Sequence, residues 1–171
     1  FQCGWLPRAQ CRAQGAVQAA NALVRSLNAA TATIQSVRNE ADSGIADATT
    51  KLNTLLQQFR QLNDAITSAA GDAAELTENM DKRDALARDI SGLIGIRVVR
   101  GPNNDRALYT DGGVTLFETE PRTVSFQPTL SMTPGAPGNS LFIHGVDVTS
   151  PSSPMVLQSG SIFGLVKLRD D

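Results

Sequence analysis

Apolar residues recur every three or four positions between residues 20 and 69. This spacing places an apolar stripe along one side of a helix, as in coiled coils. It predicts one long helix over about residues 16–69, a single rod or two rods joined by a bend, with Gly44 as a plausible break. The positions expected to pack in its core are Leu27, Ile34, Val37, Ile45, Leu52, Leu55, Phe59, Leu62 and Ile66.

A second helix is predicted over about residues 72–94. Asp72 followed by Glu75 has the spacing of a capping box, and Thr77 is a later alternative start. Gly95 can take the left-handed conformation that closes a helix. The helix is expected to fold back on the first, which gives a helical hairpin over residues 16–95. Its core positions are Leu86, Ile90 and Leu93.

Beyond Gly95 the apolar period changes to two, which is typical of strands. An antiparallel pair is expected to begin at Ile96, and the turn Asp111-Gly112-Gly113 to lead into a further strand. More strands are predicted near residues 123–130 and 140–148. The predicted class is α+β: a helical hairpin or coiled-coil-like rod, a small antiparallel β-domain over residues 96–158, and a return to helix over residues 159–171.

The first fifteen residues differ from the rest. They lack helical periodicity and hold both cysteines and the only tryptophan, so an irregular segment is expected. Cys3 and Cys11 are eight positions apart with no other metal-type ligand nearby, a weak signal for a disulfide or a zinc site. Free thiols are the expected state.

Composition narrows the possible partners. A net charge of −2 and a pI near 5.4 give no reason to expect nucleic acid or anionic lipid. The sequence holds no apolar run of the length that crosses a bilayer, so no membrane insertion is expected. Because aromatic residues make up only 5%, the core is built mostly from small aliphatic side chains. Such a core favours close helix packing over a large ligand pocket.

The charged cluster Asp81, Arg83 and Asp84 is the strongest candidate for chemistry. A catalytic carboxylate pair must converge in a cleft with further partners. Here the carboxylates are neighbours on one helix face, and Arg88 follows Asp84 by four positions, so salt bridges at the base of the hairpin are expected instead. His144, in a predicted strand, is the only histidine. No enzyme activity, cofactor or metal is predicted.

Residues 51–63, 78–96 and 160–170, in this order, resemble the flagellar hook-associated protein 1 family, which forms the first junction between hook and filament. The family's D-x-R-D-x-L element is matched by Asp81, Arg83, Asp84 and Leu86. Its G-x-x-x-G-L-x-x-x-R-D element is matched by Gly160, Gly164, Leu165, Arg169 and Asp170.

This resemblance implies a secreted structural protein of the extracellular bacterial flagellum, exported by the flagellar type III apparatus. It would polymerise into a short ring and transmit torque. Its implied partners are the hook protein, the second junction protein, copies of itself, and an export chaperone at the carboxyl end of the whole protein. The chain would then be a central fragment without both terminal helical segments.

Two alternatives belong to other functional classes. One is a secreted adhesin-like binding module that presents the β-domain on a helical stalk. An exposed apolar patch around Phe117, Phe126 or Phe142 would favour it. The other is a peptidoglycan-degrading enzyme, which needs a carboxylate of raised pKa. Glu118 and Glu120 are poor candidates because each stands among other charged or polar residues.

Overall fold

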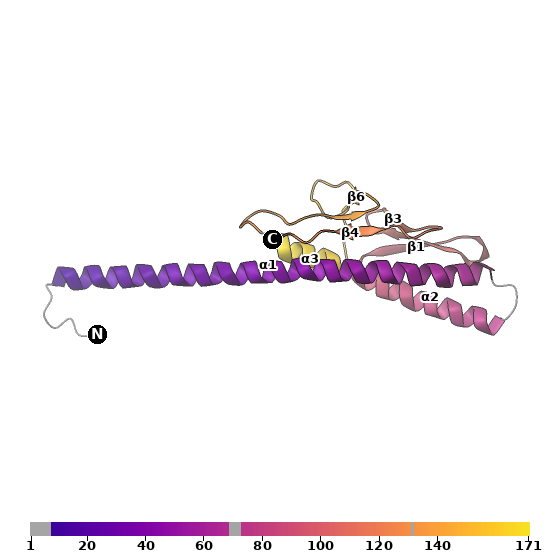
Figure 1. Ribbon diagram of the computed structural model, residues 1–171, viewed down its shortest axis with the longest axis horizontal. Helices are drawn as coiled ribbons and strands as arrows, with labels where there is room; N and C mark the ends of the chain where they lie inside the picture. The colour runs from indigo at the N-terminus through magenta and orange to yellow at the C-terminus, as the bar shows by residue number, and fades with distance from the viewer. Residues whose placement is uncertain (1–7, 69–72, 131) are drawn as a thin grey trace. The chain divides into compact units, whose positions relative to one another are not determined.

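The computed structural model describes residues 8–68, 73–130 and 132–171. Its helices are α1 (Arg8–Ser68), α2 (Ala73–Leu93) and α3 (Ser161–Asp170), and a short 3-10 turn spans Pro102–Asn104 (Figure 1). The described residues also form β1 (Ile96–Arg100), β2 (Arg106–Thr110), β3 (Thr115–Phe117), β4 (Val124–Phe126), β5 (Leu141–Ile143) and β6 (Val146–Asp147). The α+β class is therefore confirmed.

Helix α1 begins earlier than the apolar stripe predicts and is not interrupted at Gly44. Residues 8–15, expected to be irregular, are helical. The reason is that arginine, alanine and glutamine favour helix without any apolar period. Cys3 and the side chain of Cys11 lie outside the described residues, so the prediction of free thiols stays a prediction. Asp72, the expected cap of the second helix, also lies outside them.

The chain divides into two units, residues 1–37 and residues 38–171. In the first unit, the described residues all belong to α1. Three side chains predicted to be core are exposed there: Leu27 by 58%, Ile34 by 57% and Val37 by 38%. The prediction is wrong for these residues, because a single helix offers its apolar stripe no other element of the unit to pack against.

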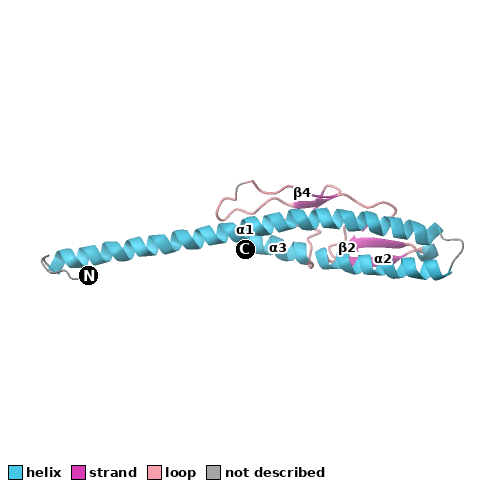
Figure 2. Cartoon of the chain, turned by 60° about the horizontal axis from the view of Figure 1, so that its bottom comes forward, coloured by secondary structure: helices cyan, strands magenta, loops and turns pink. Residues whose placement is uncertain are grey.

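Residues 38–171 form the compact unit, in which α2 runs back along α1 (Figures 1 and 2). The predicted hairpin is present, since Asn63 of α1 contacts Arg83 of α2. Helix α3 also runs antiparallel to α1: its Leu165 lies beside Gly44, and Arg169 near its end binds Asp42. Glu75 lies in the first turn of α2, where a negative charge suits the helix dipole.

Gly95 follows the end of α2 but not for the expected reason. Its φ angle is not positive. A Cβ atom there would instead lie 2.1 Å from Ser159 Oγ and 2.2 Å from Asp111 Oδ2. Its backbone N–H donates to the carbonyl oxygen of Ser159 at 3.1 Å. Close approach of two other segments, and not a left-handed cap, makes glycine necessary here.

Two antiparallel three-stranded sheets, β1-β2-β3 and β4-β5-β6, complete the unit. In the first sheet Ile96 pairs with Thr110, and a bulge falls between Leu108 and Tyr109. In the second, the loop between β5 and β6 is the two residues His144 and Gly145, with φ angles of 49° and 83°. Positive φ at both positions suits a tight hairpin turn. His144 is thus a turn residue and not the strand residue that was predicted.

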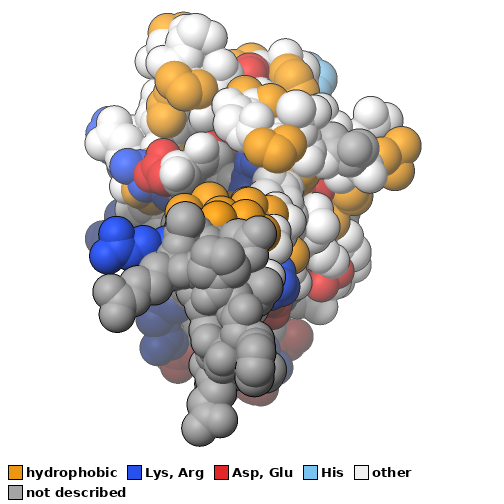
Figure 3. All heavy atoms as spheres, turned by 90° about the vertical axis from the view of Figure 1, so that its left-hand side faces the viewer, with side chains coloured by type: hydrophobic (Ala, Val, Ile, Leu, Met, Phe, Trp, Pro, Cys, Tyr) orange, Lys and Arg blue, Asp and Glu red, His pale blue; other side chains and the backbone are white. Residues whose placement is uncertain are grey.

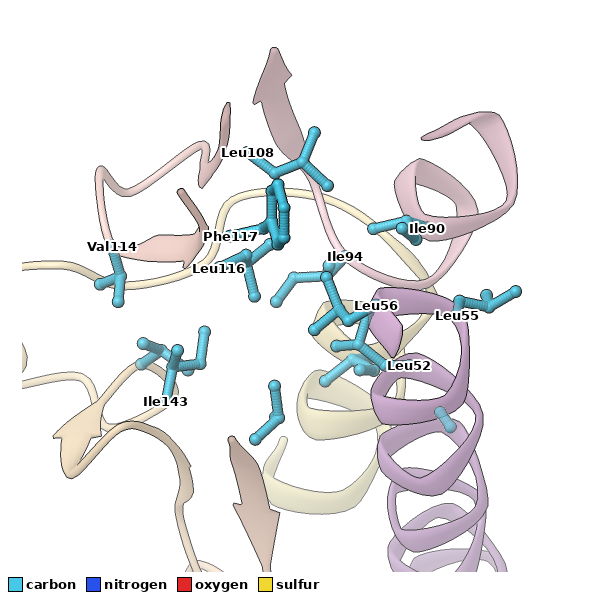
Figure 4. Packing of buried hydrophobic residues seen from close by; sticks show 14 of the residues in the cluster. Leu52, Leu55, Leu56, Ile90, Ile94, Leu108, Val114, Leu116, Phe117 and Ile143 are labelled. Carbon is cyan, nitrogen blue, oxygen red and sulfur yellow. The ribbon is translucent and has the colours of Figure 1, made fainter. Parts of the chain in front are cut away.

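The hydrophobic core lies where the helices meet both sheets. Figure 4 shows Leu52 and Leu56 of α1 near Ile94, with Leu116 and Phe117 approaching from β3. The ring of Phe59 meets that of Phe117 edge to face, with centroids 5.2 Å apart. Of the other expected core positions, Ile45, Leu55, Ile66 and Ile90 are buried, and Leu62, Leu86 and Leu93 are partly buried.

Candidate functional site

The first motif places a fully buried arginine between the helical hairpin and the first sheet. Arg83 of α2 has an exposed fraction of 0%. Its Nη1 donates to Asn63 Oδ1 of α1 at 2.8 Å and to the carbonyl oxygen of Asn104 at 2.7 Å. Burial lowers its pKa, nearby Arg106 lowers it further, and Asp84 and Asp105 oppose both. Arg83 therefore joins three segments of the chain.

The charged residues near Arg83 on α2 make separate contacts and do not converge. Asp84 forms an ion pair with Arg106 of β2, so the expected salt bridge runs to the sheet and not along the helix. Among the described residues, Arg88 donates only to the backbone oxygen of Asp84, at 3.3 Å. Asp81 is exposed, and Leu86 is partly buried against the core. The carboxylates of Asp81 and Asp84 therefore do not form a shared acid–base site.

Gly160 and Leu165 of the second motif allow α3 to dock, whereas Gly164 makes no close contact at its Cβ position. Gly160 has a φ angle of 95°, and a Cβ atom there would lie 2.7 Å from the Cα atom of Ile94. Gly164 has open space where a Cβ atom would be. Leu165 lies against Gly44 of α1, with its Cδ1 3.3 Å from the position of a Cβ atom on that glycine. Gly44 thus serves as a contact for α3 and does not break α1.

Arg169 is the centre of a buried polar cluster. It is 1% exposed, and its Nη1 donates to Asp42 Oδ1 and to the carbonyl oxygen of Asn139, each at 2.9 Å. Its Nε and Nη2 bind the two carboxylate oxygens of Asp170. Burial alone lowers the pKa of Arg169, but the hydrogen bonds to Asp170 and Asp42 outweigh it, and the pKa is raised.

The same cluster shapes the electrostatics of Asp170. Burial works to raise the pKa of this carboxyl group. Hydrogen bonds from Arg169 and from the backbone N–H of Gly138 act the other way and hold the pKa below its ordinary value. The N–H of Gly138 lies 2.9 Å from Asp170 Oδ1. The ionised form of Asp170 is therefore the one that the fold stabilises.

Two residues of α1 in this cluster were not predicted. Arg38 donates from Nε to the carbonyl oxygen of Arg169 at 2.6 Å and also binds the backbone of Thr133 and Ala136. Asp42 accepts from the backbone N–H of Thr129 at 2.6 Å. The available signal is that these two opposite charges stand four positions apart beside the apolar stripe. Arg38 and Asp42 therefore tie the loop before β5 and the end of α3 to one helix.

The features that would favour the alternative functions are largely missing from the described residues. Phe117 is buried, Phe126 packs partly buried against the core, and Phe142 alone of the three is exposed. Glu118 accepts from Tyr109 Oη at 3.3 Å, and Glu120 pairs with Arg60 at 2.7 Å. These contacts do not build the exposed aromatic patch of an adhesin or a carboxylate isolated in a cleft.

Within residues 8–68, 73–130 and 132–171, no group of three or more His, Cys, Asp or Glu side chains is placed to hold a metal ion. In the same part of the chain, no helix combines the length and the hydropathy that a membrane crossing requires.

The amino-terminal unit presents a different kind of surface. Its apolar side chains remain exposed along α1 (Figure 3). We call this set the open stripe; it consists of Val17, Leu23, Val24, Leu27, Ile34 and Val37. An apolar row of this length on a helix is typical of a surface that packs against another helix.

The chain matches the model of the flagellar hook-associated protein FlgK helical domain over residues 6–171. It is also similar to the structure of the flagellar hook junction protein FlgK from Burkholderia pseudomallei, with a TM-score of 0.71 and 23% sequence identity. That match covers 91% of this chain and 28% of the other, and at this identity it shows the fold alone. No curated protein sequence matches the chain. Because the family match runs from residue 6 to residue 171, this chain belongs to the family of the FlgK helical domain, a structural part of a flagellar hook-associated protein.

Proposed function

We propose that this chain is the central part of a protein that joins the flagellar hook to the filament. The observation that carries the proposal is the family match over residues 6–171. The proposed role in transmitting torque is supported by the buried contacts of the two motifs. Its motifs tie helices to one another and to loops beside the sheets through buried arginines, and such contacts give rigidity without any bond chemistry.

Rigidity would be useful in a junction because torque has to pass through it. Arg169 joins α3, α1 and the loop before β5, while Arg83 joins α2, α1 and the loop after β1. Each cluster therefore couples elements that are distant in sequence. We propose that the compact unit turns as one block, and that neighbouring copies in a short ring share the load over many such blocks.

The open stripe supports assembly as the role of the amino-terminal unit. Within it, Val17, Val24, Leu27, Ile34 and Val37 follow one another by seven, three, seven and three residues, which is the spacing of a helix seam. The chain spans 28% of the similar FlgK structure. We propose that helical segments of the full-length protein, outside this chain, cover the open stripe. The hook protein, the second junction protein and further copies are the proposed neighbours in the flagellum.

Location and export belong to the same proposal. We propose that the full-length protein is exported by the flagellar type III apparatus and acts outside the cell, with a chaperone bound at its carboxyl end during export. The flagellar family supports this location. Bond chemistry has no part in the proposed role.

The test is a co-pelleting assay of the full-length natural protein on purified hooks, with this chain run beside it. A junction protein that depends on its other helices should pellet at full length, whereas this chain alone should stay in solution. If the full-length protein also stays in solution, the junction role is wrong.

Two matched variants of the full-length protein test the open stripe. Leu27→Asn with Ile34→Asn places two amides on the stripe, one heptad apart. Arg25→Asn with Ala32→Asn places two on the opposite face at the same spacing, where both residues are exposed. The first pair should reduce pelleting strongly and the second should not. Equal pelleting by both pairs would remove the stripe from the proposal.

A further inference from the structure

A small hollow lies between α2 and the β1–β2 hairpin, and positive charge gathers around it. Its volume is about 200 Å³. Three arginines line it, Arg83, Arg100 and Arg106, together with one carboxylate, that of Asp105. None of the sequence motifs explains why three guanidinium groups should meet at this place.

The buried arginine in this hollow is only partly satisfied. Nη1 of Arg83 has two acceptors, but its Nε and Nη2 are buried and have no hydrogen-bond partner among the described residues. A buried donor on a charged group is costly to leave unpaired. Arg83 lines the hollow, so an acceptor held there that reaches Nε or Nη2 would remove this cost.

The charges around the hollow leave room for a further anion. Arg106 is already paired with Asp84. Asp105 is engaged by Asn63, whose Nδ2 donates to its Oδ1 at 2.6 Å. Arg100 is exposed and has no ion pair within the described part of the chain. Counting Asp84, which pairs with Arg106 but does not line the hollow, two carboxylates accompany three cations, and the excess positive charge lies with Arg83 and Arg100.

We propose that this hollow binds a carboxylate group, held between the unpaired donors of Arg83 and the guanidinium of Arg100. A planar guanidinium matches a carboxylate with two parallel hydrogen bonds, which makes such pairs strong and directional. Arg100 is exposed, so a ligand that enters from solvent meets it first and completes its contacts at Arg83. The site does not depend on the proposed junction role.

The test measures the thermal midpoint of this chain at pH 7 in sodium acetate, against sodium chloride at equal ionic strength. At about tenfold excess over Kd, acetate should raise the midpoint by about 3 °C beyond chloride. Arg100→Gln should weaken the apparent acetate affinity about tenfold. The matched control is Arg97→Gln, an exposed arginine on the same strand that does not line the hollow. It should respond as the unchanged chain does.

A direct readout keeps the test independent of stability. The Nε–H signal of Arg83 in a ¹⁵N NMR spectrum should shift with acetate and saturate at the same Kd. An equal gain from acetate and chloride, or an unmoved Arg83 signal, would overturn the site.

Sedimentation then distinguishes two sources of the carboxylate. If acetate dissociates self-associated chains, an acidic side chain of a second copy fills the hollow. If acetate binds without changing the mass, the ligand is a free carboxylate.

Discussion

Replacing Arg169 by methionine should strongly destabilise the compact unit. Methionine keeps part of the volume of the arginine stem but removes every donor. In the folded chain, Asp42 would then lose its 2.9 Å ion pair with Arg169, and the carbonyl oxygen of Asn139 would lose its donor. Asp42 would keep only its contacts with Thr129.

The magnitude follows from the burial of both partners. The exposed fractions of the two side chains are 1% for Arg169 and 4% for Asp42. Breaking a buried ion pair from one side leaves the other charge uncompensated, which costs about 3–5 kcal/mol. The bidentate contact with Asp170 lies nearer the surface and adds less. We expect a loss of about 3–5 kcal/mol in the free energy of unfolding.

The assay is urea unfolding at pH 7, followed by NMR signals of the compact unit because the circular dichroism of α1 includes the other unit. Arg97→Met, at an exposed position, is the matched control and should change stability by less than about 0.5 kcal/mol. Adding Asp42→Asn to Arg169→Met should recover at least about 1 kcal/mol of the lost free energy of unfolding, because position 42 then carries no unpaired buried charge. A loss below about 1 kcal/mol for Arg169→Met would refute the reasoning.

Three further predictions concern the core, the start of α3 and acid stability. Phe59→Ala should cost about 3–5 kcal/mol in urea unfolding because the ring is fully buried, whereas exposed Leu23→Ala should cost less than about 0.5 kcal/mol. Gly160→Ala should lower the thermal midpoint because of its positive φ and the 2.7 Å approach to the backbone, whereas Gly164→Ala, in open helix, should leave it unchanged or raise it. The folded-state pKa of Asp170 is lowered, so its contribution to stability is present above its ordinary value of 3.8 and is lost as pH falls through the lowered pKa. Urea unfolding from neutral pH into this acid range should show that loss, and Asp170→Asn should remove it.

The local order of helices and strands could be read from the sequence because hydrophobic period is a local property. A step of three or four residues identified α1 and α2, and Asp111-Gly112-Gly113 marked the turn between β2 and β3. The two motifs also drew attention to Arg83 and Arg169. Neither motif named their partners, since Arg38 reaches Arg169 across 131 residues and Arg83 reaches Asn63 across 20.

Burial, in contrast, was decided by tertiary structure. Leu27 and Ile45 occupy equivalent places in one apolar stripe, yet Leu27 is exposed and Ile45 is buried. The sequence alone determined that α1 is amphipathic, because side-chain direction repeats with the helical turn. Tertiary structure decides which part of that stripe is covered and which buried guanidinium keeps unpaired donors. Both depend on contacts with segments distant in sequence, and a local sequence pattern does not contain that information.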